Sequence, residues 1–310
     1  PVISVGNITV GGTGKTAFVK LLLELLERRG SKSAVLFRGY KRRGRGILAV
    51  SVGGGALVHH RFSGDEPYLI ANSRGETAVF VHEDRYEAGL AAMEECSPDV
   101  FVLDDGFQHV GLKRDLDIVL VDSTDPFDNG MLFPFGLLRE PLSGLSRAHL
   151  IVITRCNQSD IVEATEAVVQ EIAPAVPMMR AFHEPSSLLA GGGTFLDLSL
   201  LQGRTVYAFS GIGNHSSFYS TVIECGADIK GINSFPDHYC YSRDELSRLE
   251  EAARASGAEW LLTTEKDMVR IPDADLTFPL YALTVKMKVP SGIEQLESAL
   301  DRTLGQPPTS

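Results

Sequence analysis

Lys15 and Thr16 are the residues of this sequence best suited to phosphate chemistry, because they directly follow a glycine-rich stretch at residues 6–14. Glycines allow backbone N–H groups to converge on phosphate oxygens, and a helix that begins there adds partial positive charge. A lysine at this place reaches the β- and γ-phosphates of a nucleoside triphosphate, and the threonine hydroxyl binds Mg²⁺. The pattern predicts a nucleotide-binding loop made of Thr9, Val10, Gly11, Gly12, Thr13, Gly14, Lys15 and Thr16.

Thr9 stands where the general pattern G-x-x-x-x-G-K-[ST] has its first glycine, and Gly11 and Gly12 supply the flexibility instead. The alternative is a glycine-rich turn that only begins a helix. An apolar strand at residues 2–5 and an apolar-periodic helix after Gly14 favour the nucleotide loop, because this context defines the motif. We expect ATP rather than GTP, since residues 154–157 (TRCN) lack the acid of the guanine-reading pattern [NT]-K-x-D.

Asp104 and Asp105 directly follow an apolar run at residues 100–103. An acidic residue in this place completes the Mg²⁺ site of P-loop enzymes, and hard cations prefer carboxylate oxygens. The alternative is a turn with two solvated acids, and the nucleotide loop upstream favours the metal site. Arg38 and Arg139 each border an expected active-site loop, where a guanidinium group binds phosphate and neutralises transition-state charge.

Asp65 and His238 are candidates for proton transfer, because a kinase that acts on a hydroxyl needs a group to orient it and accept its proton. Each has an alternative. Asp65 is also placed to cap a helix that runs to about Ser73, and His238 also fits an ordinary loop histidine. Composition and spacing leave both open.

Strands and helices that alternate along the chain must position these residues. Several strands are continuous apolar runs, which is typical of a parallel sheet covered by helices on both faces. Ligands of such sheets lie at the carboxyl ends of the strands, where the candidate residues are found. The fold class that we predict is α/β, a P-loop NTPase-type parallel sheet with helices on both faces, plus a smaller α/β C-terminal domain.

The pattern changes near residue 184, so we place a P-loop kinase domain at residues 1–183 and a smaller α/β lobe at residues 184–310. An alternative for the last helix of that lobe is that it packs back on the first domain. Two local predictions accompany this division. Residues 46–50 and 56–60 are expected to form a β-hairpin, and residues 185–203 an irregular excursion.

The composition is that of a globular protein, with 310 residues, 44% hydrophobic and 22% charged residues. A net charge of −11 argues against a general nucleic-acid binder. Four widely spaced cysteines favour neither a zinc site nor a disulfide framework. No apolar run has the ~18–20 residues of a membrane span, and no signal peptide is visible.

Taken together, ten stretches resemble the tetraacyldisaccharide 4′-kinase family, the lipid A 4′-kinases of Gram-negative bacteria. They span residues 2–267 in family order, and GNITVGGTGKT combined with GDEP, DDGFQH and LREP is highly specific. The stretches are VISVGNITVGGTGKT (2–16), RGYKRR (38–43), GDEP (64–67), HEDR (82–85), LDDGFQH (103–109), RDLDIVLVD (114–122), LLREP (137–141), SGIGN (210–214), FPDHY (235–239) and TTEKD (263–267).

The resemblance implies transfer of the ATP γ-phosphoryl group to the 4′-hydroxyl of a tetraacylated glucosamine disaccharide 1-phosphate. It implies Asp65 as catalytic base with His238 as its partner, and Lys15 and Arg139 in catalysis. Thr16, Asp104, Asp105 and Glu140 would serve Mg²⁺. The implied disaccharide phosphate site consists of Asn7, Arg38, Gly39, Tyr40, Arg85, Gln108 and Arg139.

The resemblance also implies a peripheral enzyme on the cytoplasmic face of the bacterial inner membrane. Family members carry a hydrophobic N-terminal helix, whereas this chain begins at Pro1, so we expect a preceding segment to be missing. The basic run Lys41-Arg42-Arg43 with Arg45 would meet anionic headgroups. The main alternative from another class is a regulatory P-loop NTPase switch without a lipid acceptor.

Overall fold

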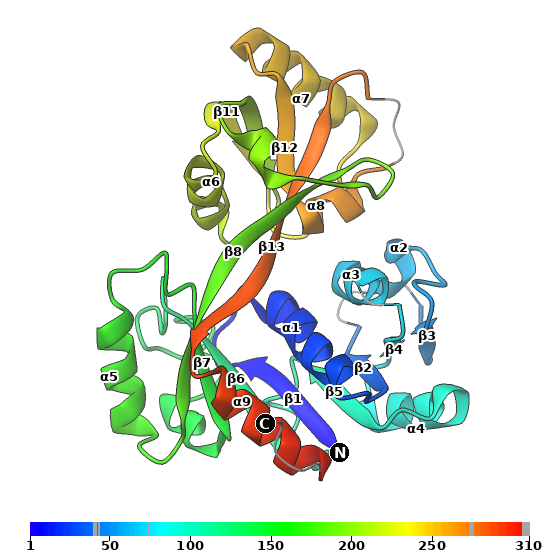
Figure 1. Ribbon diagram of the computed structural model, residues 1–310, viewed down its shortest axis with the longest axis vertical. Helices are drawn as coiled ribbons and strands as arrows, with labels where there is room; N and C mark the ends of the chain where they lie inside the picture. Colours follow the sequence, from blue (N-terminus) through cyan, green and yellow to red (C-terminus); the bar gives the residue numbers. More distant parts are fainter. Residues whose placement is uncertain (40–41, 43, 74, 273–275, 306–310) are drawn as a thin grey trace. The chain divides into compact units, whose positions relative to one another are not determined.

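The computed structural model describes residues 1–39, 42, 44–73, 75–272 and 276–305 (Figure 1). The chain forms two compact units. The first contains Pro1–His183 and the residues from Met287 onward, and the second contains Glu184–Lys286. The chain passes from the first unit to the second along β8 (Met178–Ala190) and returns along β13 (Leu280–Ser291).

The first unit is built on a sheet whose strands are parallel, except for the antiparallel edge strand β3. The order is β8-β7-β6-β1-β5-β2-β4-β3. The bounds are β1 (Val2–Asn7), β2 (Ser33–Phe37), β3 (Leu48–Val52), β4 (Ala78–Val81), β5 (Val100–Asp104), β6 (Leu116–Asp122) and β7 (Leu150–Thr154). Every residue of β2, β4, β6 and β7 is buried, which explains the apolar runs that these strands contain.

Helices cover both faces of this sheet, as the sequence predicts. Alternate strand residues pack on one face with α1 (Lys15–Arg28), α3 (Asp65–Ser73) and α9 (Ile293–Leu304). The other face packs against α4 (Arg85–Cys96) and α5 (Val162–Ile172). The predicted fold class is therefore confirmed, with helices on both sides of a parallel sheet.

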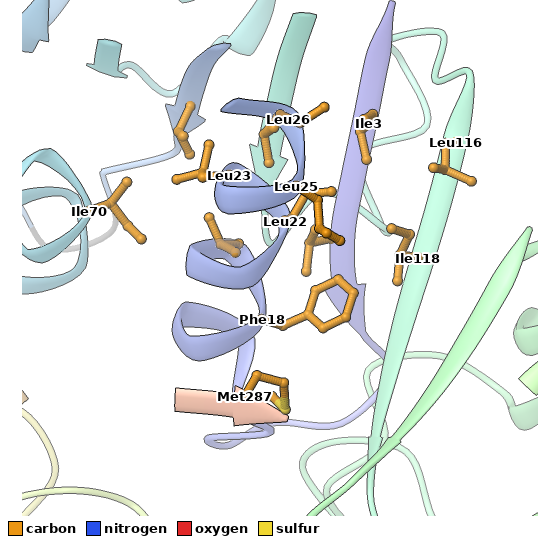
Figure 2. Close-up of a cluster of buried hydrophobic side chains, with 14 of the residues drawn as sticks. Ile3, Phe18, Leu22, Leu23, Leu25, Leu26, Ile70, Leu116, Ile118 and Met287 are labelled. Carbon is orange, nitrogen blue, oxygen red and sulfur yellow. The ribbon is translucent and has the colours of Figure 1, made fainter. Parts of the chain in front are cut away.

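Helix α1 is the centre of the largest hydrophobic cluster, shown in Figure 2. Phe18, Leu22 and Leu26 recur at a spacing of four residues and are fully buried. They pack against Ile3 of β1 and Ile118 of β6. This packing fixes the start of α1, and with it Lys15, relative to the carboxyl ends of the central strands.

The C-terminal segment belongs to the first unit. Leu296, Ala299 and Leu300 of α9 are buried in the same cluster as α1, because the apolar stripe of this amphipathic helix requires a partner surface. The sequence-based division placed residues 184–310 in the second lobe, with the option that the last helix packs on the first domain. In the structure, the residues from Met287 onward belong to the first unit.

The second unit has its own parallel sheet in the order β11-β10-β12-β13. The strands are β10 (Thr205–Ser210), β11 (Asp228–Ser234), β12 (Trp260–Thr264) and β13, and the helices are α6 (His215–Glu224), α7 (Arg243–Ser256) and α8 (Glu265–Arg270). Two hydrophobic clusters, one around Phe218 and Val222 and one around Leu246 and Leu249, cover it.

Two local predictions were wrong. Residues 56–60 form no strand, because β3 pairs antiparallel with β4 instead and the chain enters the short helix α2 (His60–Ser63). Residues 185–203 are not irregular throughout, since β8 continues to Ala190 and pairs with β9 (Phe195–Leu196) across a turn that contains Gly192 and Gly193 at positive φ. In the described part of the chain, none of the helices combines the length and apolar character needed to cross a bilayer.

Candidate active site

The predicted nucleotide loop connects the end of β1 at Asn7 with the start of α1 at Lys15. Gly14 precedes the helix with φ of 89°, and a Cβ there would lie 2.4 Å from Nε2 of His183, so only glycine fits. The Gly12 carbonyl accepts a hydrogen bond from Arg155 (2.7 Å), and the Thr13 carbonyl accepts one from the Thr154 hydroxyl (3.0 Å). Thr154 at the end of β7 and Arg155 after it therefore hold the loop in shape.

Lys15 lies within a chain of polar contacts. Its Nζ donates to Oδ1 of Asn7 at 2.9 Å and lies 3.4 Å from Oδ1 of Asp105. Asp105 also receives two hydrogen bonds from Nη1 of Arg139, at 2.8 and 2.7 Å. The structure thus brings together four predicted site residues that come from three separate motifs.

The charges around Asp105 settle its protonation state. Burial raises the pKa of this carboxyl, but Lys15 and Arg139 lower it by more, so the pKa lies below its ordinary value. Asp105 is therefore ionised at neutral pH and holds two cations at the nucleotide loop. The backbone N–H of Arg139 donates to the Ile8 carbonyl at 2.7 Å, which ties the arginine to β1 and its loop.

Glu140 and Gln108 form a second group beside the first. Nε2 of Gln108 donates to the Asn7 carbonyl at 2.9 Å and to Oε1 of Glu140 at 2.8 Å. Glu140 also pairs with Arg147 at 2.7 Å. Arg147 was not predicted, because nothing in LREP indicates that an arginine seven residues later folds back onto the glutamate.

The GDEP motif lies next to α1. The Thr16 hydroxyl donates to Oε1 of Glu66 at 3.4 Å, and Nδ1 of His60 lies 3.7 Å from Oδ1 of Asp65. Asp65 is the first residue of α3, one place inside the cap position expected from the sequence. Glu66 and His60 were missed, although Glu66 stands within a motif that had been noted.

Arg38 and Arg85 lie close enough to interact electrostatically, together with Asp104 and Asp105. Arg85 is buried, with a side chain that donates to the Glu83 carbonyl at 3.5 Å, whereas Arg38 is exposed. Burial lowers the pKa of Arg85, and repulsion from Arg38 lowers it further. Two such arginines form an electropositive site that suits a phosphate group.

Gly39 has φ of 74°, and a Cβ there would lie 2.6 Å from Cγ1 of Val81, which explains the glycine after Arg38. Tyr40, the next predicted substrate residue, lies outside the described residues, as do Lys41 and Arg43 of the basic run.

His238 belongs to the second unit, in the loop between β11 and α7. Its φ of 63° is in the left-handed region, and its backbone N–H donates to the Gly211 carbonyl at 3.2 Å. Nη2 of Arg270 lies 3.4 Å from its Nδ1. The ring is thus held by a neighbouring loop and helix, and its side chain is 55% exposed.

In the described part of the chain, no group of three or more His, Cys, Asp or Glu side chains is placed to hold a metal ion. Magnesium at a nucleotide loop takes ligands from phosphates and waters as well, so a smaller protein set is sufficient. The oxygen donors of Thr16 and Glu66, which lie together, and of the buried Asp104 suit a hard cation.

Sequence reasoning also missed the residues that support the loop from β7 and β8. Arg155 pairs with Asp122 at the end of β6, and burial lowers the pKa of Arg155 to about 10. His183 is buried against Gly14, and burial with the charge of Arg155 lowers the pKa of its imidazole to about 3. His183 is therefore neutral at physiological pH.

The family model of tetraacyldisaccharide-1-P 4′-kinase matches residues 1–305 of this chain. The chain belongs to this kinase family. A tetraacyldisaccharide 4′-kinase of Geobacter metallireducens is 42% identical, over 98% of this chain and 88% of the relative. One from Syntrophobacter fumaroxidans is 41% identical, over 87% of this chain and 71% of the relative. These relatives are enzymes, and this member of the family is a kinase of the same kind.

The fold is shared with a solved member of the family. A crystal structure of the kinase from Aquifex aeolicus in complex with ATP superposes with a TM-score of 0.76 at 36% sequence identity. The match covers 98% of this chain and 88% of that one.

Proposed function

We propose that this chain transfers the γ-phosphoryl group of ATP to the 4′-hydroxyl of tetraacyldisaccharide 1-phosphate, a step of lipid A biosynthesis. The observation that carries the proposal is the position of Lys15 at the start of α1, in contact with Asn7 and beside Asp105 and Arg139. Family membership and the ATP complex of the Aquifex relative support the choice of reaction and of nucleotide.

Two cations of the site would neutralise the charge that develops during transfer. Lys15 is placed to bind the β- and γ-phosphates, and Arg139 to bind the transferred group or the substrate phosphate. In the reaction the bond from the γ-phosphorus to the β–γ bridging oxygen breaks, and a bond to the 4′-oxygen forms. ADP leaves as the second product. Because Asp105 already holds both cations, little reorganisation is needed when the triphosphate binds.

Asp65 is the proposed acceptor of the 4′-hydroxyl proton. Its carboxylate is half-buried at the start of α3, one residue before the glutamate that contacts Thr16. His60, 3.7 Å away, is the neighbour that orients it in the first unit. His238 is proposed to assist this proton transfer on the strength of the family resemblance.

The remaining roles are assigned by contact. Arg38 and Arg85 are proposed to bind the substrate phosphate. Gly39 is proposed to form the turn that positions Arg38. Gln108, through its bond to the Asn7 carbonyl, orients the same region. Tyr40 is proposed as a substrate residue from the resemblance alone.

Magnesium is proposed to be held by Thr16, Glu66 and Asp104, with Asp105 and Glu140 close to the same loop. When bound, the ion would neutralise phosphate charge during transfer. Glu66 is added to the set predicted from sequence because of its contact with Thr16. Glu140 is paired with Arg147 and Gln108, so it would act by holding these groups as much as by binding the ion.

We further propose that the protein acts at the cytoplasmic face of the bacterial inner membrane, since the substrate carries four acyl chains.

The deciding experiment is transfer of label from γ-³²P-ATP to tetraacyldisaccharide 1-phosphate in detergent micelles, with and without Mg²⁺. We expect Mg²⁺-dependent label in the lipid. The Lys15→Ala variant should lose both triphosphate binding and transfer, whereas Lys113→Ala, which removes a lysine whose side chain is 90% exposed, should behave as wild type. Label released only as free phosphate, whatever lipid is present, would favour the regulatory NTPase switch instead.

A further inference from the structure

A short loop after β6 exposes five large apolar side chains within seven residues. The side chains of this apolar loop, residues 131–137, are exposed by 55% at Met131, 46% at Leu132, 66% at Phe133, 80% at Phe135 and 36% at Leu137. Residues 129–138 contain no charged side chain. Large exposed apolar patches on folded proteins mark sites that bind a membrane, a protein partner or an apolar ligand.

The apolar loop has a fixed conformation. The N–H of Phe133 donates to the Leu138 carbonyl at 2.7 Å, and the N–H of Leu138 donates to the Met131 carbonyl at 3.1 Å. The N–H groups of Phe135 and Gly136 both donate to the Leu132 carbonyl. Backbone groups at the tip therefore find partners within the turn itself.

Two side chains at the base of the loop complete this pairing. Asn129 accepts from the Met131 N–H at 2.9 Å and donates to the Phe135 carbonyl at 2.9 Å. Asp128 accepts from the Leu137 N–H at 3.2 Å. With Pro134, which has no N–H, the turn presents apolar side chains and few unpaired backbone donors. That combination is what entry into hydrocarbon requires, because a backbone group without a hydrogen-bond partner is strongly disfavoured there.

The loop is attached directly to the nucleotide-binding loop. The N–H of Val10 donates to the Leu137 carbonyl at 2.7 Å, and Thr9 forms a β-bridge with Leu138. Val10 is itself 41% exposed and extends the apolar surface. The next residue after the bridge is Arg139, which contacts Asp105. Apolar surface and phosphate chemistry are thus joined within a few residues.

We propose that the apolar loop inserts into the hydrocarbon of a lipid bilayer and places the site at the membrane surface. A bilayer is favoured over a protein partner because the loop offers no charge and few free hydrogen-bonding groups for specific recognition. The biological reason rests on the proposed function: a tetraacylated substrate resides in the membrane, so insertion beside Arg139 would bring the phosphate-binding groups to its headgroup level.

The test is binding to vesicles of pure phosphatidylcholine, which contain no substrate, measured by co-sedimentation. The double variant F133S/F135S should lower the partition coefficient about tenfold or more, because two aromatic side chains no longer enter hydrocarbon. The matched control is F195S/I223S, which removes two apolar side chains of similar exposure (63% and 60%) from the second unit and should bind as wild type.

Insertion itself is measured by fluorescence. The chain has one tryptophan, so the wild-type protein supplies the baseline for a Phe135→Trp variant. We expect the added emission to shift to the blue on mixing with vesicles and to be quenched by lipids brominated on the acyl chains.

Two results would overturn the proposal. Vesicle binding of F133S/F135S equal to that of wild type would show that the loop does not enter the bilayer. If the F133S/F135S variant binds vesicles like wild type but has a raised KM for substrate in micelles, the loop would contact the acyl chains of the substrate instead of the bilayer. Because the vesicles carry no substrate, intact binding in a protein that phosphorylates no lipid would count against the proposed function and still support insertion.

Discussion

Asp105 organises the site at the level of single residues. Its carboxylate binds Arg139 through two hydrogen bonds and lies 3.4 Å from Nζ of Lys15, which also donates to Oδ1 of Asn7. Each cation is thus oriented by a neutral or anionic neighbour. Electrostatic groups that are oriented in advance stabilise transition-state charge most effectively, because they need not rearrange during the reaction.

Replacing Asp65 with asparagine should test its role as base. The change keeps the shape of the side chain and removes its basicity, so we expect kcat to fall by about 10²–10⁴-fold with little change in ATP affinity. The control is Asp197→Asn, at a carboxylate that caps a short helix in the second unit through the Ser199 N–H. A kcat equal to wild type would reduce Asp65 to a residue that only begins α3.

His183 should make the first unit less stable in mild acid. Because the folded-state pKa is about 3 against an ordinary 6.5, the folded chain binds fewer protons than the unfolded chain between these values. This contribution to stability is fully present above pH 6.5 and is lost as pH falls toward 3. We expect the free energy of unfolding to fall by about 2 kcal/mol between pH 7 and pH 5 because of this residue.

The measurement is urea unfolding of wild type and His183→Gln at both pH values. Glutamine takes up no proton, so the unfolding free energy of His183→Gln should fall less between pH 7 and pH 5. The difference from wild type should equal the contribution of His183. Equal losses in the two proteins would show that His183 is not held neutral against Gly14.

At the level of elements, loops after parallel strands carry the candidate residues in both units. In the second unit a buried ion pair in α8, between Asp267 and Arg270, holds the loop after β10. Asp267 accepts from the Gly211 N–H (3.0 Å) and the Tyr241 hydroxyl (2.9 Å), and Arg270 donates to the Gly211 carbonyl (2.8 Å). The same carbonyl accepts from the His238 N–H, so the pair also sets the place of His238.

Asp267→Ala should therefore affect both stability and turnover. The change removes a buried ion-pair partner of Arg270 and the acceptor of the Gly211 N–H and the Tyr241 hydroxyl, which costs about 3–5 kcal/mol of unfolding free energy. Turnover should fall with it if His238 assists the reaction, and the pH dependence of kcat should change. In the control Glu259→Ala, which breaks the exposed pair with Arg204, the unfolding free energy should change little. Similar effects of the two changes on unfolding would contradict the positioning role.

At the level of the whole molecule, the chain returns to its first unit after completing the second. Leu300 of α9 has no exposed surface and lies in the same cluster as α1 and the central strands. The first unit is consequently built from both ends of the described chain, and the second is an insertion between β8 and β13.

Leu300→Ala should destabilise the first unit by about 2–5 kcal/mol, because it leaves a cavity in a packed cluster. Hydrogen exchange should accelerate in β1 and β6 and stay unchanged in β10 and β12. Leu200→Ala, at a residue that is 45% exposed in the second unit, serves as control. Faster exchange confined to the second unit would place α9 there instead.

The nucleotide loop, the strands that precede it and the parallel sheet were predictable from the sequence, because glycine spacing, apolar runs and helical periodicity are local properties. Asp104 and Asp105 were named because they directly follow an apolar run, and Arg139 because it borders an expected active-site loop. Glu140 and Arg85, in contrast, were named from the family resemblance. Lys15 and Asp105 follow β1 and β5, and their approach follows from the parallel pairing of these strands, whereas Arg139 is placed by its backbone bond to Ile8.

Only the tertiary structure decided which residues meet across long stretches of sequence. Glu66 reaches Thr16 over 50 residues, and His183 packs on Gly14 from the end of the first unit. The same holds for Asp267 with Gly211, for α9 in the first unit, and for β3, which pairs with β4 rather than with residues 56–60. Such contacts depend on how the buried faces of distant elements fit together, and no local pattern of residue types records that fit.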